Sequence, residues 1–163
     1  MQEQSDNVIE EKRDVYGDFE KMFDGERAMW KEKISDLSQR MRDIRAVGEV
    51  QIELFSSRQQ ILEYNFKLGQ ILNKLNMKFR KDKADRLRFY SNSTNSTQVR
   101  YGSNEKTPLI ESDLSDLIGK TDLIDNHMSY LTETIKTIDH FLYGIKSRIQ
   151  LEDFMRNGSA KNI

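Results

Sequence analysis

Residues 121–156, TDLIDNHMSYLTETIKTIDHFLYGIKSRIQLEDFMR, carry the apolar pattern that decides the fold class. The apolar side chains recur at alternating steps of four and three residues, for nearly four heptads. Such a repeat is typical of a coiled-coil seam rather than of a generic amphipathic helix. We assign eight residues to this seam and to oligomerisation: Ile124, Met128, Leu131, Ile135, Ile138, Leu142, Ile145 and Ile149. The predicted class is all-α with a coiled-coil C-terminal helix.

The segment upstream, residues 26–90, has no proline and also repeats apolar residues at steps of three and four. One run covers residues 30–44 and a second covers residues 61–79, with a slip of phase around residues 46–48. This pattern predicts one long helix with a basic C-terminal end, about 95 Å long at about 1.5 Å per residue.

Shorter segments complete the predicted organisation. Residues 91–110 hold the only proline and a cluster of Ser, Thr and Asn, which predicts a polar loop. Residues 111–158 are the predicted C-terminal oligomerisation helices, a short one over 112–118 and then the heptad helix. Residues 1–25 predict a short N-terminal helix that is either mobile or docked on a neighbour, and residues 159–163 form a tail.

Long helix, loop and long helix together predict an antiparallel helical hairpin. The chain is 33% charged and only 36% hydrophobic, with one proline and eight glycines among 163 residues. This composition suits narrow seams between helices better than a thick globular core. Since neither helix of the hairpin covers its own apolar stripe, we expect homo-oligomerisation to complete the core.

Several classes of chemistry are not expected from this sequence. The chain has no cysteine, which excludes disulfides, thiolate zinc sites and thiol nucleophiles. Its two histidines, His127 and His140, are expected at helix surfaces or interfaces, about 20 Å apart and too far to share a metal. There is no glycine-rich phosphate loop and no HExxH or GxSxG motif. We therefore expect no enzymatic activity, no cofactor and no metal.

A membrane location is not expected either. No stretch approaches 18 consecutive apolar residues, the length that a spanning helix needs at about 1.5 Å per residue. The first residues, MQEQSDNVIEEKRD, are acidic and polar and resemble neither a signal peptide nor a transit peptide. These features predict a cytoplasmic protein.

Residues 78–92, KFRKDKADRLRFYSN, concentrate positive charge in a chain of net charge −1. Residues 78–102 hold seven basic and two acidic groups, a net charge of +5 that leaves −6 for the remainder. Cations beside aromatic rings suit single-stranded nucleic acid, since cations neutralise phosphates and rings stack on bases. The predicted DNA-binding residues are Lys78, Arg80, Lys81, Lys83, Arg86, Arg88, Tyr90, Arg100 and Tyr101. The alternative is a solvated helix end, with Phe79, Leu87 and Phe89 buried in the hairpin.

Three stretches together resemble the UvsY family, the recombination mediators of T4-like phages. They are RLRFYSN at 86–92, TPLIESDLSDLIGKTDLI at 107–124 and IDHFLYGIKSRIQLEDFMRNG at 138–158. The similarity runs from about Leu62 to Gly158. It implies a non-enzymatic protein that binds single-stranded DNA and self-associates into ring-like homo-oligomers through its C-terminal helices. It also implies that the protein helps a RecA-type phage recombinase to displace the phage single-strand-binding protein, in the cytoplasm of an infected bacterium.

The basic motif of that family reads Leu-Lys-Ala-Arg-Leu before an aromatic-Tyr-Ser sequence. Arg86 and Leu87 match its Arg and Leu, whereas Ala84 and Asp85 stand at the Lys and Ala positions. Lys83 and Arg88 are adjacent replacements for the missing charge, so the resemblance implies a basic segment with altered contacts.

The predicted function is therefore single-stranded DNA binding that helps load a RecA-type recombinase onto DNA covered by single-strand-binding protein. The alternative is a helical coiled-coil assembly or scaffold protein without nucleic-acid binding, which would have the same heptads. A membrane-surface helix is a third reading, but residues 78–90 are short and weakly apolar on any one face.

Overall fold

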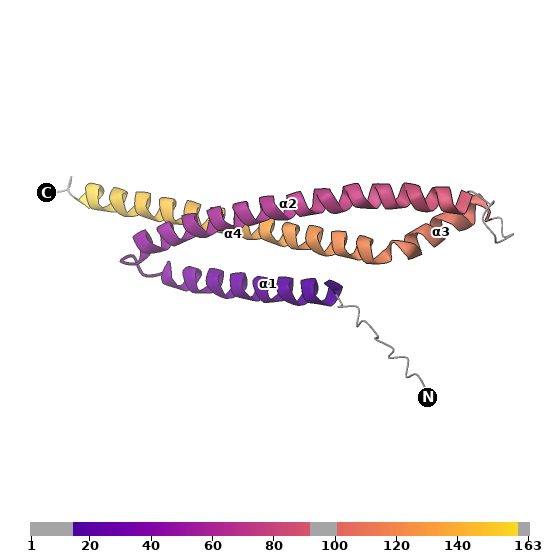
Figure 1. The fold of residues 1–163 in the computed structure, drawn as a ribbon. Coiled ribbons are helices and arrows are strands. Elements are labelled where there is room, and N and C mark those ends of the chain that lie inside the picture. Colours follow the sequence, from indigo (N-terminus) through magenta and orange to yellow (C-terminus); the bar gives the residue numbers. More distant parts are fainter. Residues whose placement is uncertain (1–14, 92–100, 160–163) are drawn as a thin grey trace, which may run out of the picture.

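The computed structural model describes residues 15–91 and 101–159, and throughout these ranges its regular elements are α-helices (Figure 1). There are four of them: α1 (Val15–Arg40), α2 (Val47–Ser91), α3 (Ser103–Asp113) and α4 (Ser115–Ser159). The predicted all-α class is confirmed.

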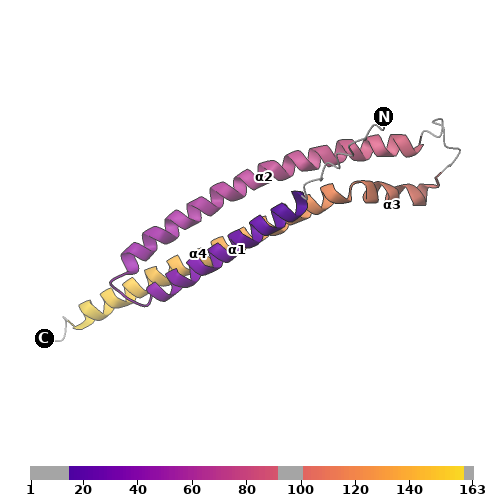
Figure 2. The same ribbon diagram turned by 60° about the horizontal axis from the view of Figure 1, so that its bottom comes forward.

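The two 45-residue helices, α2 and α4, run antiparallel and lie side by side (Figure 1). Helix α1 lies along them, parallel to α4 and mainly against it (Figure 2). The short α3 lies just beyond the N-terminal end of α4 and packs against the C-terminal end of α2. The result is an elongated bundle in which three helices overlap for only part of its length.

The core is a narrow seam between α1, α2 and α4. Each helix contributes a ladder of buried apolar side chains seven residues apart. The three ladders are Phe23, Trp30 and Leu37; Val47, Leu54, Ile61 and Leu68; and Ile124, Leu131, Ile138 and Ile145. A seven-residue step keeps each ladder on one face of its helix, and burying one such side chain contributes about 1.5–3 kcal/mol.

The predicted stripe of α4 lies largely inside the core of the single chain. Four of its eight residues are fully buried, and Met128, Ile135 and Leu142 pack against the buried cluster. Only Ile149 is clearly exposed, at 40%. The prediction that other copies must cover this stripe was wrong for these seven residues, because α1 of the same chain supplies the third helix.

The predicted helix over residues 26–90 was also wrong, because the chain reverses at residues 41–46 between α1 and α2. Arg40 donates two hydrogen bonds across this turn to the carboxylate of Glu53, at 2.7 and 3.0 Å. The guanidinium of Arg148 donates to the carbonyl oxygen of Met41 at 2.8 Å, so α4 is attached to the turn as well. The slip of apolar phase near residue 46 is the start of a new helix running in the opposite direction.

Three other helix boundaries differ from the predictions. Helix α1 continues through Gly25, where the N-terminal helix was expected to end. Helix α3 occupies part of the predicted loop 91–110 and includes Pro108 in its second turn. Helix α4 starts at Ser115 and continues through Gly119. In each case a single Gly or Pro costs less than the packing of the neighbouring apolar residues contributes, so these residues did not end the helices.

Candidate nucleic-acid interface

The basic run occupies the last turns of α2, at the end of the bundle that α1 does not reach (Figure 1). The last fully buried residue of α2 is Leu68, ten residues before the run begins. All six cations of the run are exposed: Lys78, Arg80, Lys81, Lys83, Arg86 and Arg88. This end of the hairpin therefore presents its charges to solvent on a helix that extends past the core.

Charge is unevenly distributed along α2, and this strengthens the positive electrostatic potential at its C-terminal end. Residues 47–63 hold three acidic groups and one basic group, whereas residues 64–91 hold eight basic groups and two acidic ones. The net charge of the helix thus changes from −2 in its first part to +6 in its second. Such segregation raises the local concentration of an anionic partner at one end of the molecule.

Ion pairs engage only two of the six cations within the described ranges. Arg88 lies 3.6 Å from Asp85 one turn earlier, and Arg86 lies 3.5 Å from Asp113. The ammonium of Lys83 stands 5.6 Å from the centre of the Phe79 ring, a cation–π distance. Four cations of the run are thus without a carboxylate partner among the residues that the structure describes.

Three aromatic rings lie together at the end of the basic run. The Tyr90 ring meets Phe89 edge-on at 5.3 Å and Tyr101 edge-on at 5.5 Å. Phe89 is 61% exposed and Leu87 is 49% exposed, so neither is buried in the hairpin as the solvated-end alternative required. Phe89 was not among the predicted contacts, yet it offers the most open ring of this group, and Tyr90 is half-buried.

Asp113 joins two of the predicted contacts from a separate helix. The Tyr90 hydroxyl donates to Asp113 Oδ2 at 2.8 Å, and the Arg86 Nε lies 3.5 Å from the same oxygen. The hydrogen bond to Asp113 is the main cause that raises the pKa of Tyr90, so this phenol remains protonated. Sequence reasoning did not select Asp113, because it lies 23 residues beyond Tyr90, in the short helix predicted over residues 112–118.

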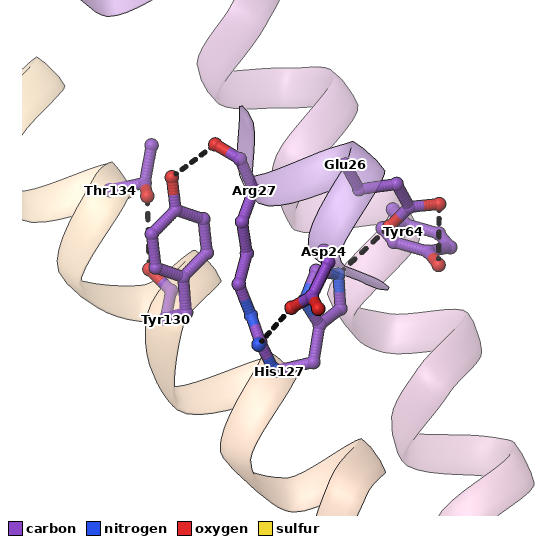
Figure 3. Close-up of polar contacts among 7 residues, drawn as sticks. All are labelled: Asp24, Glu26, Arg27, Tyr64, His127, Tyr130 and Thr134. Carbon is purple, nitrogen blue, oxygen red and sulfur yellow. Dashed lines mark hydrogen bonds and ion pairs between the residues drawn. The ribbon is translucent and has the colours of Figure 1, made fainter. Parts of the chain in front are cut away.

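A second cluster of polar side chains lies inside the bundle (Figure 3). His127 is fully buried, stacks on Phe23 at 4.3 Å, and holds its Nε2 2.8 Å from Glu26 Oε2. The other oxygen of Glu26 accepts from the Tyr64 hydroxyl at 3.0 Å. This cluster joins α1, α2 and α4.

The buried position of His127 was not predicted, since it was expected at a surface or interface. Its spacing contained the signal, because it lies three residues after Ile124 and four before Leu131 on the buried face. Its Nδ1 has no hydrogen-bond partner within the described residues. The cluster thus connects the three helices through side-chain contacts.

The cluster predicts a pH-dependent stability. Burial is the main cause that lowers the pKa of His127 from its ordinary 6.5, against the opposing effect of Glu26. The unfolded chain then binds a proton that the folded chain does not, so the free energy of unfolding falls as the pH drops below about 6.5. Each unit of lowered pKa contributes about 1.4 kcal/mol.

Urea unfolding between about pH 5 and 7 measures this effect. His127→Gln should show a shallower pH dependence than the wild type. His140→Gln, at an exposed position of the same helix, is the control and should retain the wild-type dependence. Identical slopes for His127→Gln and the wild type would contradict the assignment.

The described ranges, residues 15–91 and 101–159, bear on metal binding and on membrane insertion. In these ranges no three His, Asp or Glu side chains lie close enough together to bind a metal ion. The helices described there include none with the length and apolarity to span a bilayer. Arg100, the remaining predicted DNA contact, lies outside the described residues.

Comparison of the chain with protein-family models, with curated proteins and with solved structures found no match.

Proposed function

We propose that this protein is a UvsY-like recombination mediator, which binds single-stranded DNA and helps a RecA-type recombinase replace single-strand-binding protein on it. The observation that carries the proposal is the run of six exposed cations at the end of α2, in a chain of net charge −1. The sequence resemblance at residues 86–92, 107–124 and 138–158 supports it independently.

The arrangement at the end of α2 suits a strand without a defined base sequence. Flexible lysine and arginine side chains neutralise phosphates of any sequence, and an open ring such as Phe89 gives a base a surface for stacking. Binding of this kind is expected to be strongly salt-dependent and nearly indifferent to sequence.

Self-association belongs to the same proposal and is supported by apolar side chains outside the core. Beyond Arg148, α4 extends past the α1–α2 turn (Figure 1). Leu151, Phe154 and Met155 are all largely exposed on this extension. Clustered exposed apolar side chains typically mark an interface.

A groove of about 380 Å³ lies beside the base of this extension, lined by Phe55 of α2 and by Leu142, Tyr143 and Ile149 of α4. In a ring-like homo-oligomer, many basic ends would act on one strand. Once one subunit is bound, the others would meet the same strand at a high effective concentration. The affinity of the whole ring would then greatly exceed that of one subunit.

Two measurements test the proposed function. Fluorescence anisotropy with labelled oligo-dT should show binding that weakens steeply with salt. Adding the protein to single-stranded DNA covered by single-strand-binding protein should shorten the lag before a RecA-type phage recombinase hydrolyses ATP. Absence of oligo-dT binding at low salt would contradict the proposal and favour the scaffold alternative.

A further inference from the structure

Helix α3 lies against the basic end of α2 (Figure 1). Residues 103–113 hold three carboxylates and one lysine. Ile110 and Leu114 are buried and hold α3 in place, while Asp113 is the last residue of the helix. The backbone leaves α-helical geometry immediately afterwards, at Leu114, where φ is −106° and ψ is 8°. Asp113 therefore stands at a break between two helices.

The contacts of Asp113 are those expected of a phosphate oxygen. A single carboxylate oxygen accepts the 2.8 Å hydrogen bond from Tyr90 and lies 3.5 Å from the Arg86 guanidinium. Arginine guanidinium groups and tyrosine hydroxyl groups are common hydrogen-bond donors to nucleic-acid phosphates. Both groups belong to the predicted DNA contacts, and neither can give the same donor to a phosphate while Asp113 holds it.

We propose that Asp113 is an internal competitor for nucleic-acid phosphate, which occupies Arg86 and Tyr90 in the free protein and is displaced when a single strand binds. This inference rests on the proposed function. The 3.5 Å separation and the partly exposed Arg86 side chain make the contact one that a phosphate can replace. The four cations without a carboxylate partner in the described residues, Lys78, Arg80, Lys81 and Lys83, stay open for the first encounter.

Competition of this kind sets a threshold for binding. A short or weakly held anion engages the open lysines but does not release Arg86. A strand that runs across several subunits gains enough from each additional phosphate to replace Asp113 at each one. The device would thus favour long single strands over short polyanions.

Asp113→Asn tests the proposal, because it keeps the size and an acceptor oxygen while removing the charge. Titration of oligo-dT at several salt concentrations is the measurement. We expect Asp113→Asn to bind about three- to tenfold more tightly at about 100 mM salt. With an oligo-dT too short to release Arg86 in the wild type, its slope of log K against log salt should be steeper by about 0.7, because the variant neutralises one phosphate that the wild type does not.

Glu111→Gln is the matched control, since Glu111 is exposed on the same helix and outside the Arg86 and Tyr90 contact. It makes the same change in net charge and should alter affinity less than about twofold, with an unchanged slope. Equal effects of Asp113→Asn and Glu111→Gln would overturn the proposal.

Asp113→Glu tests whether tighter binding comes from loss of the charge or from a loosening of α3. This variant keeps the charge and changes the geometry. Its affinity should stay near the wild-type value, and tighter binding by this variant would overturn the proposal. If the wild type binds oligo-dT but Asp113→Asn is no tighter, the inference fails and the proposed function stands. If neither binds, the proposed function fails and the inference fails with it.

Discussion

Replacing Lys78, Lys81 and Lys83 together with glutamine is expected to weaken binding to oligo-dT by about 100-fold at 0.1 M salt. All three are exposed and lack a carboxylate partner within the described residues. Each phosphate neutralised on a single strand contributes about 0.7 to the slope of log K against log salt, so three contacts account for about two powers of ten between 1 and 0.1 M salt. The slope should become shallower by about 2.

The matched control replaces Lys21, Lys31 and Lys136 with glutamine. These lysines are also exposed, but they lie on α1 and α4 away from the basic end of α2. The change in net charge is the same, and helicity should be retained in both variants because Lys and Gln have similar helix propensities. Equal losses of affinity would mean that overall charge governs binding. No loss in either variant would mean that the run is only a solvated helix end.

Ile138→Asp is expected to unfold the chain. Ile138 is fully buried at the centre of the α4 ladder, against residues of the same chain. The substitution loses about 1.5–3 kcal/mol of apolar burial and adds the cost of a buried carboxylate, which is several kcal/mol. Their sum is comparable with the whole stability of a typical domain, about 5–15 kcal/mol. Circular dichroism should show a large loss of helix and no cooperative thermal transition.

Phe154→Asp is the contrasting variant in the same helix. Phe154 is 74% exposed on the extension of α4, so its replacement should leave the melting temperature nearly unchanged. Because the proposed self-association uses this extension, sedimentation should instead give a smaller mass for Phe154→Asp than for the wild type. If Ile138→Asp yields folded monomers while Phe154→Asp keeps the wild-type mass, the seam lies between copies and the intramolecular packing is misassigned.

The sequence was sufficient to predict the helical class and the face of α4, because periodicity is a local property that short windows reveal. It was not sufficient to predict which helix covers that face. A ladder such as Ile124, Leu131, Ile138 and Ile145 looks the same whether α1 of the same chain or another copy packs on it. The reversal at residues 41–46 has no Gly or Pro, and the contacts of Arg40 with Glu53 and of Arg148 with Met41 join distant residues.

The candidate site shows the same division. Composition was sufficient to predict the basic run and the exposure of its cations. Both follow from a high density of charge at the end of a helix. The roles of Asp113 and His127 depend on partners 23 and 101 residues away in the chain. Sequence spacing offers no measure of such distances, although the place of His127 between Ile124 and Leu131 did mark it as inward-facing.

The basic end of α2 and the apolar end of α4 lie at opposite ends of the hairpin (Figure 1). A helix of 45 residues is about 68 Å long at about 1.5 Å per residue. A strand bound at one end and a neighbouring subunit bound at the other would therefore be separated by about 6–7 nm of rigid helix. Rotation of a subunit by only 10° about its contact would then move the bound strand by roughly 11 Å, which is more than one nucleotide spacing.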